Sequence, residues 1–344
     1  MKDFILYFNS GTLEYQATFS SYKAIVDDIK NDSEVKNYFR GIACHIEGDI
    51  FFLPDLRFYE SIESIIEYGY KLTLEDFVRF VKNNDYFIFN FTHGKYGEDG
   101  IFQSVCTYFD IPTNMFDYES AFLTYSKYNT LLFIKENIKN VKIPQTFYFN
   151  LNTTEEDFEG IVLDLDFGCK YIVKANNLGS SIGMEVYDNL SVDILIDYRD
   201  RNSKYTNSFI IQKFIEGKEV TVGVFKYKDR FIDLPAVVPE SKKGFLDFFV
   251  KHSNNGINIK IFKNESLGCR LNIISQNIYN KINLMGAVRI DYIIKDDDIY
   301  FLEVNLLPGL GEHSVLPIML KEVGISRADF IKMSIENFYN GTVT

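Results

Sequence analysis

A strand–turn–strand pattern at residues 287–305 constrains the fold of this chain more than any other feature of its sequence. Two largely apolar stretches flank the polar run Lys-Asp-Asp-Asp, which is typical of an antiparallel hairpin. If the turn centres on Asp297, Asp291 lies directly opposite Glu303. Cross-strand Cβ atoms are roughly 5 Å apart, so two opposed carboxylates repel each other unless a cation lies between them. The pattern therefore predicts a buried hairpin with a cation site on one face.

The same register adds two residues to that face. Alternation with a period of two places Arg289 opposite Asn305, beside Asp291 and Glu303. Carboxylate and amide oxygens are hard ligands that leave room for phosphate oxygens and water, which suits Mg²⁺ better than a soft metal. A solvated hairpin face is the alternative, but the apolar residues on the other face indicate a buried sheet.

A loop rich in glycine and serine follows a predicted strand at residues 171–174. Gly179 and Gly183 bracket this loop, and its backbone N–H groups can close over phosphate oxygens while Lys174 supplies a positive charge. The spacing matches neither the Walker A pattern nor the dinucleotide fingerprint. An ordinary hairpin turn is an equal alternative, so the loop alone does not identify a nucleotide site.

Two further segments carry polar residues at the ends of predicted strands. The strand at residues 209–214 leads to Glu219, so its edge can meet an adenine and the carboxylate can bind ribose hydroxyls. The segment from His93 to Gly100 packs charges and glycines behind a strand at residues 86–91, a place where α/β proteins often bind ligands. A flexible, solvated turn is the alternative for this second segment.

The order of the predicted elements indicates an α/β protein with two or three modules. Strands at residues 4–8 and 42–46 flank a stretch with helical spacing, which gives a βαβ-like beginning. A helix at residues 125–137 ends before a proline, where a new module is expected to start. The polar excursion at residues 239–264 contains Phe245, Phe248 and Phe249, which it could bury on closing, so we expect it to form a lid over bound ligands.

Composition argues against several classes of partner. The net charge of -12 disfavours nucleic acid, because binding to its phosphate backbone depends on Lys and Arg displacing counterions. The first residues carry neither a signal-peptide pattern nor the roughly 20 apolar residues of a membrane span. We therefore expect a cytoplasmic protein with no membrane partner. The four cysteines lie far apart without metal-ligand spacing, which favours reduced thiols.

Taken in order, these segments resemble the D-alanine:D-alanine ligases of the ATP-grasp superfamily. The matching motifs are His93-Gly-x-x-Gly-Glu-Asp-Gly100, Ser126-Lys127 with Thr130, Ile172-Val-Lys174 with Gly179-Ser-Ser-Ile-Gly183, Glu216-Gly-Lys-Glu219, Arg289-Ile-Asp291, Leu302-Glu-Val-Asn305-x-x-Pro-Gly309 and His313-Ser314-x-x-Pro317. The resemblance implies an α/β (α+β) chain with a three-subdomain ATP-grasp fold and an N-terminal βαβ domain. The expected boundaries are 1–114 for the N-terminal domain, 115–208 for the central subdomain and 209–344 for the C-terminal subdomain.

The resemblance also implies roles for individual residues. The residues expected to bind ATP, through its phosphates, adenine and ribose, are Lys127, Lys174, Ser180, Gln212, Lys213, Ile215 and Glu219. Two Mg²⁺ ions, which Mn²⁺ can replace, are expected on Asp291, Glu303 and Asn305. The expected catalytic residues are Glu14, Ser181, Lys251, Arg289 and Gly309. Of these, Glu14 is expected to bind the ammonium of the first substrate. Further substrate contacts are expected from His93, Glu98, His252 and Ser314.

The implied activity is ATP-dependent joining of two D-alanine molecules through an acyl phosphate, with release of ADP and phosphate. The expected partners are ATP and small amino acids, and a homodimer is compatible with the resemblance. Two features depart from the family: Ser10-Gly-Thr-Leu-Glu14 replaces its usual N-terminal motif, and His252 stands where a tyrosine is common. A ligase that forms another dipeptide or a depsipeptide therefore remains an alternative. A nucleotide-binding regulator is another, disfavoured because binding alone requires no oxyanion arginine such as Arg289.

Overall fold

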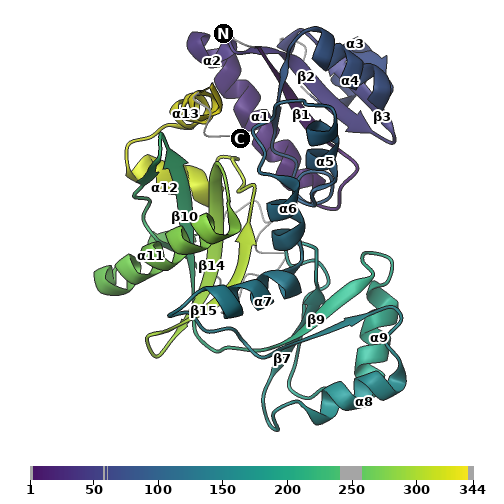
Figure 1. Ribbon diagram of the computed structural model, residues 1–344, viewed down its shortest axis with the longest axis vertical. Coiled ribbons are helices and arrows are strands. Elements are labelled where there is room, and N and C mark those ends of the chain that lie inside the picture. The colour runs from purple at the N-terminus through teal and green to yellow at the C-terminus, as the bar shows by residue number, and fades with distance from the viewer. Residues whose placement is uncertain (1–2, 57–58, 60, 241–257, 340–344) are drawn as a thin grey trace.

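The computed structural model of the chain describes residues 3–56, 59, 61–240 and 258–339. Three β-sheets follow one another along the chain, and each is accompanied by helices (Figure 1). The predicted α/β class is therefore confirmed. Within the described ranges, no helix has both the length and the apolar character needed to cross a membrane.

The N-terminal sheet has the strand order β4-β3-β2-β1-β5. Its strands are β1 (Phe4–Asn9), β2 (Phe39–Ile46), β3 (Asp49–Leu53), β4 (Tyr70–Leu72) and β5 (Phe87–Asn90), and its helices are α1 (Tyr15–Asn31), α2 (Ser33–Lys36), α3 (Ile62–Tyr68), α4 (Leu74–Asn83) and α5 (Ile101–Tyr108). Because β1 runs parallel to β2 and α1 lies between them in sequence, the predicted βαβ beginning is confirmed. Every residue of β1 is buried, as expected for a central parallel strand.

The central sheet is antiparallel, with the strand order β6-β9-β7-β8. Its elements are β6 (Thr146–Asn150), α8 (Glu155–Leu163), β7 (Tyr171–Ala175), β8 (Glu185–Tyr187), α9 (Val192–Asn202) and β9 (Ser208–Lys213), preceded by α6 (Tyr118–Tyr125) and α7 (Lys127–Asn137). Because β9 pairs with β6 and β7, the central sheet continues past residue 208, where we expected the subdomain to end. The domain boundaries themselves remain predictions.

The C-terminal sheet has the order β13-β12-β10-β14-β15, with β11 paired to β10. Its elements are β10 (Lys218–Tyr227), β11 (Arg230–Ile232), β12 (Val237–Glu240), β13 (Asn258–Ile261), α11 (Glu265–Ile282), β14 (Ala287–Lys295), β15 (Asp298–Asn305), α12 (Val315–Glu322) and α13 (Arg327–Tyr339). The excursion expected as a lid begins in β12 and ends just after β13, and these two strands pair with each other. Residues 241–257, which form most of that lid, lie outside the described residues.

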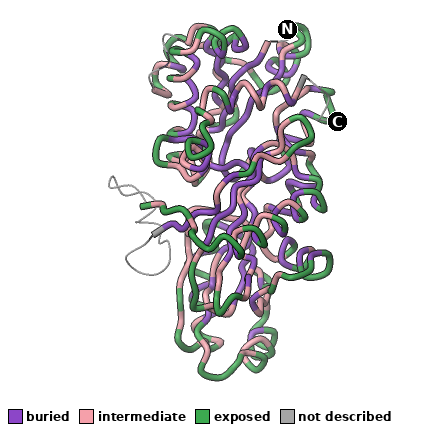
Figure 2. The backbone as a smooth tube through the Cα atoms, turned by 90° about the vertical axis from the view of Figure 1, so that its left-hand side faces the viewer, coloured by how far each residue is buried: buried purple, intermediate pink, exposed green. Residues whose placement is uncertain are grey.

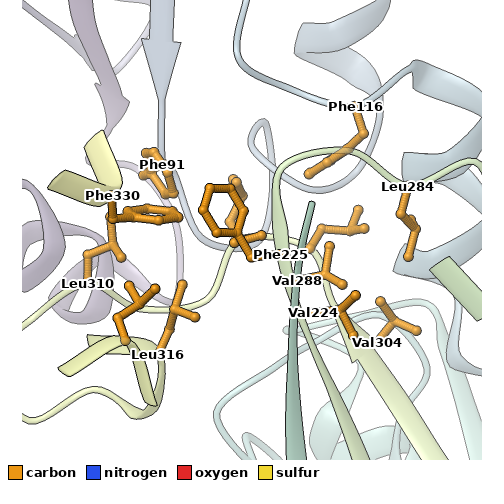
Figure 3. Packing of buried hydrophobic residues seen from close by; sticks show 14 of the residues in the cluster. Phe91, Phe116, Val224, Phe225, Leu284, Val288, Val304, Leu310, Leu316 and Phe330 are labelled. Carbon is orange, nitrogen blue, oxygen red and sulfur yellow. The ribbon is translucent and has the colours of Figure 1, made fainter. Parts of the chain in front are cut away.

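The apolar cores join two of the three sheets. One cluster contains residues from the N-terminal sheet, the C-terminal sheet and α13, and Figure 3 shows Phe91, Phe225 and Phe330 close together within it. A separate, smaller cluster fills the central lobe, around Phe149 and Phe158. Figure 2 shows buried backbone through the upper and middle parts of the molecule and mostly exposed backbone at the tip of this lobe. The central lobe therefore has its own core.

Candidate active site

The hairpin of β14 and β15 has the predicted register at the end that carries the polar residues. Asp291 pairs with Glu303, and Arg289 pairs with Asn305. The alternative of a solvated hairpin face does not hold for Asp291, which is 4% exposed. The sequence therefore identified both the members of this face and their pairing.

The turn of this hairpin differs from the prediction. It consists of Asp296 and Asp297, whose φ values of 50° and 66° are left-handed, as a type I′ turn requires. A turn centred between these two residues shifts the expected pairing by one residue, and a β-bulge compensates for the shift. Tyr292 pairs with Phe301 while Asp291 pairs with Glu303, so Leu302 is the extra residue. The bulge thereby restores the register on which the site depends.

Three side chains hold the carboxylate of Asp291. Arg289 donates from Nε to Oδ1 at 3.1 Å and from Nη2 to Oδ2 at 3.0 Å. Asn305 donates to Oδ2 at 2.9 Å, and Thr221 of β10 donates to Oδ1 at 2.7 Å. Burial opposes the charge of Arg289, but the Asp291 carboxylate prevails and raises the pKa of the guanidinium. Arg289 is therefore held as a fixed positive charge facing the site.

The oxygens on this face fit Mg²⁺ that is held together with phosphate. Asp291, Glu303 and Asn305 offer two carboxylates and an amide, although Arg289, Thr221 and the amide of Asn305 already bond Asp291. No group of three or more His, Cys, Asp or Glu side chains forms a metal cage in the described ranges. Mg²⁺ commonly keeps several waters and takes one or two carboxylates plus substrate phosphates. Such a shared site matches this donor set better than a closed protein cage.

A cavity of about 460 Å³ lies between the central and C-terminal sheets. The predicted site residues that line it are Lys127, Lys174, Ser180, Ser181, Gln212, Ile215, Glu219 and Glu303. Ile172, Met184 and Leu302 give the same cavity apolar walls, against which a base can pack. The structure therefore brings segments from both sheets to one space that has charged groups and apolar surface.

Lys127 connects this cavity to the hairpin. It is the first residue of α7, and its ammonium donates to the carbonyl of Leu178 at 2.7 Å. Its Nζ also lies 3.5 Å from Oε2 of Glu303. A positive charge thus stands beside the carboxylate where the phosphates are expected.

Of the residues predicted to bind ATP, Lys213 does not line this cavity. Its ammonium pairs with Asp166 at 2.7 Å. Alternation along β9 sends Gln212 toward the cavity and Lys213 to the other face. The ammonium of Lys213 is therefore turned away from the cavity, and a contact with ATP remains a prediction.

The glycine- and serine-rich loop meets Glu14, which lies 165 residues earlier in the sequence. The Gly179 N–H donates to Oε1 of Glu14 at 3.2 Å, and the Ser180 hydroxyl donates to Oε2 at 3.1 Å. A Cβ at position 179 would lie 2.5 Å from Oε2 of Glu14, so any larger residue there would displace this carboxylate. Ser180 and Ser181 both have left-handed φ values, 54° and 60°, which is costly for residues other than glycine and is found most often at functional sites.

Glu98 lies close to Glu14 and bonds two backbone segments. Its carboxylate accepts the Gly94 N–H at 2.7 Å and the Leu307 N–H at 3.1 Å. Burial, followed by the neighbouring Glu14 carboxylate, raises the pKa of Glu98 to about 7. Glu98 therefore changes its protonation near neutral pH, where an ammonium substrate would favour the charged form.

His93 is buried and stays neutral. Burial, followed by the charge of Arg289, lowers its pKa to about 4. Its Nε2 lies 3.2 Å from the hydroxyl of Ser21, a buried residue of α1 that the sequence analysis missed. That hydroxyl also accepts the Leu310 N–H at 3.0 Å. His93 is thus connected through Ser21 to the segment that contains Gly309.

Gly309 and Ser314 adjoin each other after β15. A Cβ at position 309 would lie 2.7 Å from the Ser314 hydroxyl and 3.9 Å from the Ser21 hydroxyl. Ser314 is the N-cap of α12, but its side chain makes no capping bond. The predicted oxyanion donor and the predicted substrate hydroxyl therefore lie side by side.

Two residues predicted for the site cannot be placed, and two residues found at the site were not predicted. Lys251 and His252 lie outside the described residues. Thr221 and Ser21 were missed, because the partner of each belongs to another segment of the chain. The available signals were spacings: Thr221 lies two residues after Glu219 on one strand face, and Ser21 lies seven residues after Glu14.

Comparison with known proteins agrees with this geometry. The family model described as D-ala D-ala ligase C-terminus matches residues 138–336. A D-alanine–D-alanine ligase of Petrotoga mobilis is 30% identical over 281 residues, covering 80% of this chain and 89% of the relative. One of Fervidobacterium nodosum is 32% identical over 260 residues, covering 72% and 80%. 

Solved structures share the fold at lower identity. The VanG D-Ala:D-Ser ligase from Enterococcus faecalis superposes with a TM-score of 0.75 at 20% identity, over 98% of this chain and all of that one. A D-alanine–D-alanine ligase from Bacillus anthracis complexed with ATP gives 0.69 at 20% identity, over 99% and 98%. The predicted ATP-grasp fold is confirmed, and the chain belongs to the D-alanine–D-alanine ligase family.

Proposed function

We propose that this protein is an ATP-dependent ligase that joins two molecules of D-alanine through an acyl phosphate. One observation carries the proposal: a single site combines a cavity fit for a nucleotide, the fixed guanidinium of Arg289, and Glu14 beside the loop of Ser180. Nucleotide binding alone requires neither an arginine for an oxyanion nor a carboxylate for an ammonium. A regulator without catalysis is therefore the weaker reading.

The first step activates a carboxylate. An amine does not attack a carboxylate readily, because the carboxylate is anionic and lacks a leaving group. Transfer of the γ-phosphoryl group to the carboxylate of the first D-alanine creates that leaving group and releases ADP. Lys127 and Lys174 line the cavity where they can neutralise the phosphates, and Glu14 can hold the ammonium of the first substrate. Mg²⁺, when bound at Asp291, Glu303 and Asn305, supplies further neutralisation of the phosphoryl charge.

The second step forms the peptide bond. The amine of the second D-alanine attacks the acyl carbon, an oxyanion develops, and phosphate then leaves. In this mechanism Arg289, held by both oxygens of Asp291, and the backbone N–H of Gly309 stabilise that oxyanion. Ser314, next to Gly309, can hold the carboxylate of the second substrate.

The test is phosphate release by the purified protein with ATP and Mg²⁺, with products identified by mass spectrometry. The substrates are D-alanine, L-alanine, D-serine and D-lactate, alone and in pairs. We expect D-alanyl-D-alanine as the main product, with one ADP and one phosphate per peptide. Turnover with D-alanine and D-lactate but not with D-alanine alone would make the protein an ester-forming ligase, and no turnover with any pair would support the regulator.

Three finer points belong to the same proposal. We expect two Mg²⁺ ions, replaceable by Mn²⁺, which a titration of activity against each metal measures. We expect no nucleic-acid or membrane partner and a cytoplasmic location. A homodimer also remains a prediction, which sedimentation of the purified protein tests.

A further inference from the structure

Three polar residues at the start, middle and end of α1 are spaced seven residues apart: Glu14, Ser21 and Asp28. Seven residues fall about 20° short of two helical turns, so these residues share one face of α1. Each contacts a different distant segment. Glu14 accepts from Gly179, Ser21 accepts from Leu310, and Asp28 accepts from Arg327 at the start of α13.

Two of these contacts converge on the peptide groups of Leu310, the residue after Gly309. The Leu310 N–H donates to Ser21 at 3.0 Å, and the Leu310 carbonyl accepts from Nη1 of Arg327 at 3.4 Å. Arg327 is itself oriented by Asp28, to which it donates from Nε and, at 2.9 Å, from Nη2. The Leu310 side chain is fully buried, and Figure 3 shows it near Leu316 and Phe330. Both polar atoms and the side chain of Leu310 are therefore fixed.

We propose that Ser21 and Arg327 are positioning residues that set the direction of the Gly309 N–H. This inference rests on the proposed function, in which that N–H stabilises the oxyanion. Neither residue has to touch the substrate: Ser21 bonds the peptide group that follows Gly309, Arg327 bonds the peptide group after that one, and α1 connects both to Glu14. One helix face thus aligns the ammonium ligand with the oxyanion donor. Preorganised donors lose their effect when they are misplaced by about 1 Å, which can cost on the order of 100-fold in rate.

The hydroxyl of Ser21 has a defined orientation. Because its oxygen accepts the Leu310 N–H, its own hydrogen is available to Nε2 of His93 at 3.2 Å. A neutral His93 can accept that hydrogen, whereas a charged one cannot. Asp28 and Arg327 are each about one-fifth exposed, so water can weaken their pairing only in part.

Lys332 provides a matched control on the same helix. It lies in α13 and pairs with Asp32 at 3.1 Å and Glu34 at 3.3 Å, at the start of α2. Lys332 and Arg327 therefore both join α13 to the N-terminal domain through carboxylates, as the proximity of α13 to α1 and α2 in Figure 1 shows. Of the two, Arg327 is the one that also bonds Leu310. If these residues only dock α13 on the N-terminal domain, substitutions of Arg327 and of Lys332 should have similar effects. If Arg327 also positions Leu310, its substitution should have the larger effect on catalysis.

The experiment compares Arg327→Met, Arg327→Lys, Ser21→Ala and Lys332→Met with wild type. We expect kcat for phosphate release to fall about 10- to 100-fold in Arg327→Met and Ser21→Ala, with the KM for ATP changed less than about threefold. Arg327→Lys should recover part of the loss, and Lys332→Met should stay within about twofold of wild type. An equal loss of kcat in Arg327→Met and Lys332→Met would overturn the proposal.

A second readout does not depend on turnover. Hydrogen–deuterium exchange should accelerate in the peptide that contains Leu310 in Ser21→Ala and Arg327→Met, but not in Lys332→Met, because only the first two remove a hydrogen-bond partner of Leu310. Unchanged exchange in all variants would also overturn the proposal. If wild type shows no ligase turnover, the proposed function fails, while this measurement still decides whether Ser21 and Arg327 hold Leu310.

Discussion

The β14–β15 hairpin and the Gly309–Leu310 segment stand next to each other, yet they are held in opposite ways. In the hairpin, Asp291 bonds Arg289 two residues away and Asn305 fourteen residues away. Leu310 bonds Ser21, which is 289 residues away in the sequence. The hairpin is thus fixed largely by its own strands, whereas the segment after it depends on the N-terminal domain.

This difference has a consequence for how each half of the site can fail. Damage to the contact between α13 and α1 should disturb the oxyanion donor while the hairpin keeps its register. Damage within the hairpin should remove the charges that hold phosphate while the Leu310 contacts persist. Variants can therefore separate the two regions, and the expected effects differ in size.

The largest effect is expected from Glu303→Gln in the hairpin. The amide keeps the size of the side chain but removes a charge beside the phosphate site, so kcat should fall at least about 100-fold with the fold intact. Asp298→Asn is the control, since Asp298 belongs to the same hairpin and pairs with Lys142 on the surface. Steady-state kinetics over a range of Mg²⁺ concentrations measure both. Near wild-type turnover in Glu303→Gln would remove this residue from the metal site.

A somewhat smaller loss is expected from Lys174→Met in the cavity. Removing a preorganised phosphate contact should lower kcat/KM for ATP by about 2 to 3 kcal/mol of transition-state stabilisation. Lys135→Met serves as the control, because Lys135 is exposed in the last turn of α7. Kinetics with ATP as the varied substrate provide the comparison. Equal values in the two variants would place Lys174 outside the nucleotide site.

The next effect concerns Glu98 of the N-terminal domain, which accepts the N–H of Leu307 in the segment after β15. Its pKa of about 7 in the folded protein exceeds the ordinary value of 4.5. The folded state therefore binds the proton of Glu98 more tightly than the unfolded state does. The protonated carboxyl stabilises the fold fully below about pH 4.5, and this stabilisation is lost as the pH rises through 7. Relative to Glu98→Gln, wild type should lose on the order of 2 kcal/mol between pH 5 and pH 8.

Urea unfolding of both proteins at pH 5 and pH 8 measures that loss. The variant gives up one hydrogen-bond acceptor at either pH, so only the change with pH carries information. A wild-type-minus-variant difference that is equal at the two pH values would show that Glu98 keeps an ordinary pKa.

The smallest effect is expected at the hairpin turn. Asp296→Asn combined with Asp297→Gly should stabilise the protein by about 0.5 to 1 kcal/mol, because Asn-Gly adopts the two left-handed conformations at lower cost. The turn between β2 and β3 already carries a glycine, Gly48, at its second left-handed position. Urea midpoints measure the gain, and turnover should not change. Destabilisation by the double substitution would mean that the aspartates make contacts that Asn and Gly cannot replace.

The sequence alone determined the strands that carry the motifs, the order of the motifs and the pairing of Asp291 with Glu303, since each depends on periodicity within a short stretch. It placed the turn incorrectly, because the bulge at Leu302 shifts the alternation by one residue within the continuous apolar run 299–302, where the shift cannot be seen in the sequence. It also assigned Lys213 to the nucleotide from the motif, and that assignment remains a prediction, with the ammonium of Lys213 paired to Asp166.

Only the tertiary structure decided that Ser21 and Arg327 meet at Leu310 and that Glu14 meets Ser180. The contacts of Ser21 with Leu310 and of Glu14 with Ser180 close loops of 289 and 166 residues. Local propensity carries no information about such closures, because their entropy cost is offset by burial elsewhere in the shared core rather than by the contacts themselves. The seven-residue spacing on α1 was present in the sequence, but the packing of α13 and the Leu310 segment against that face gave it a meaning.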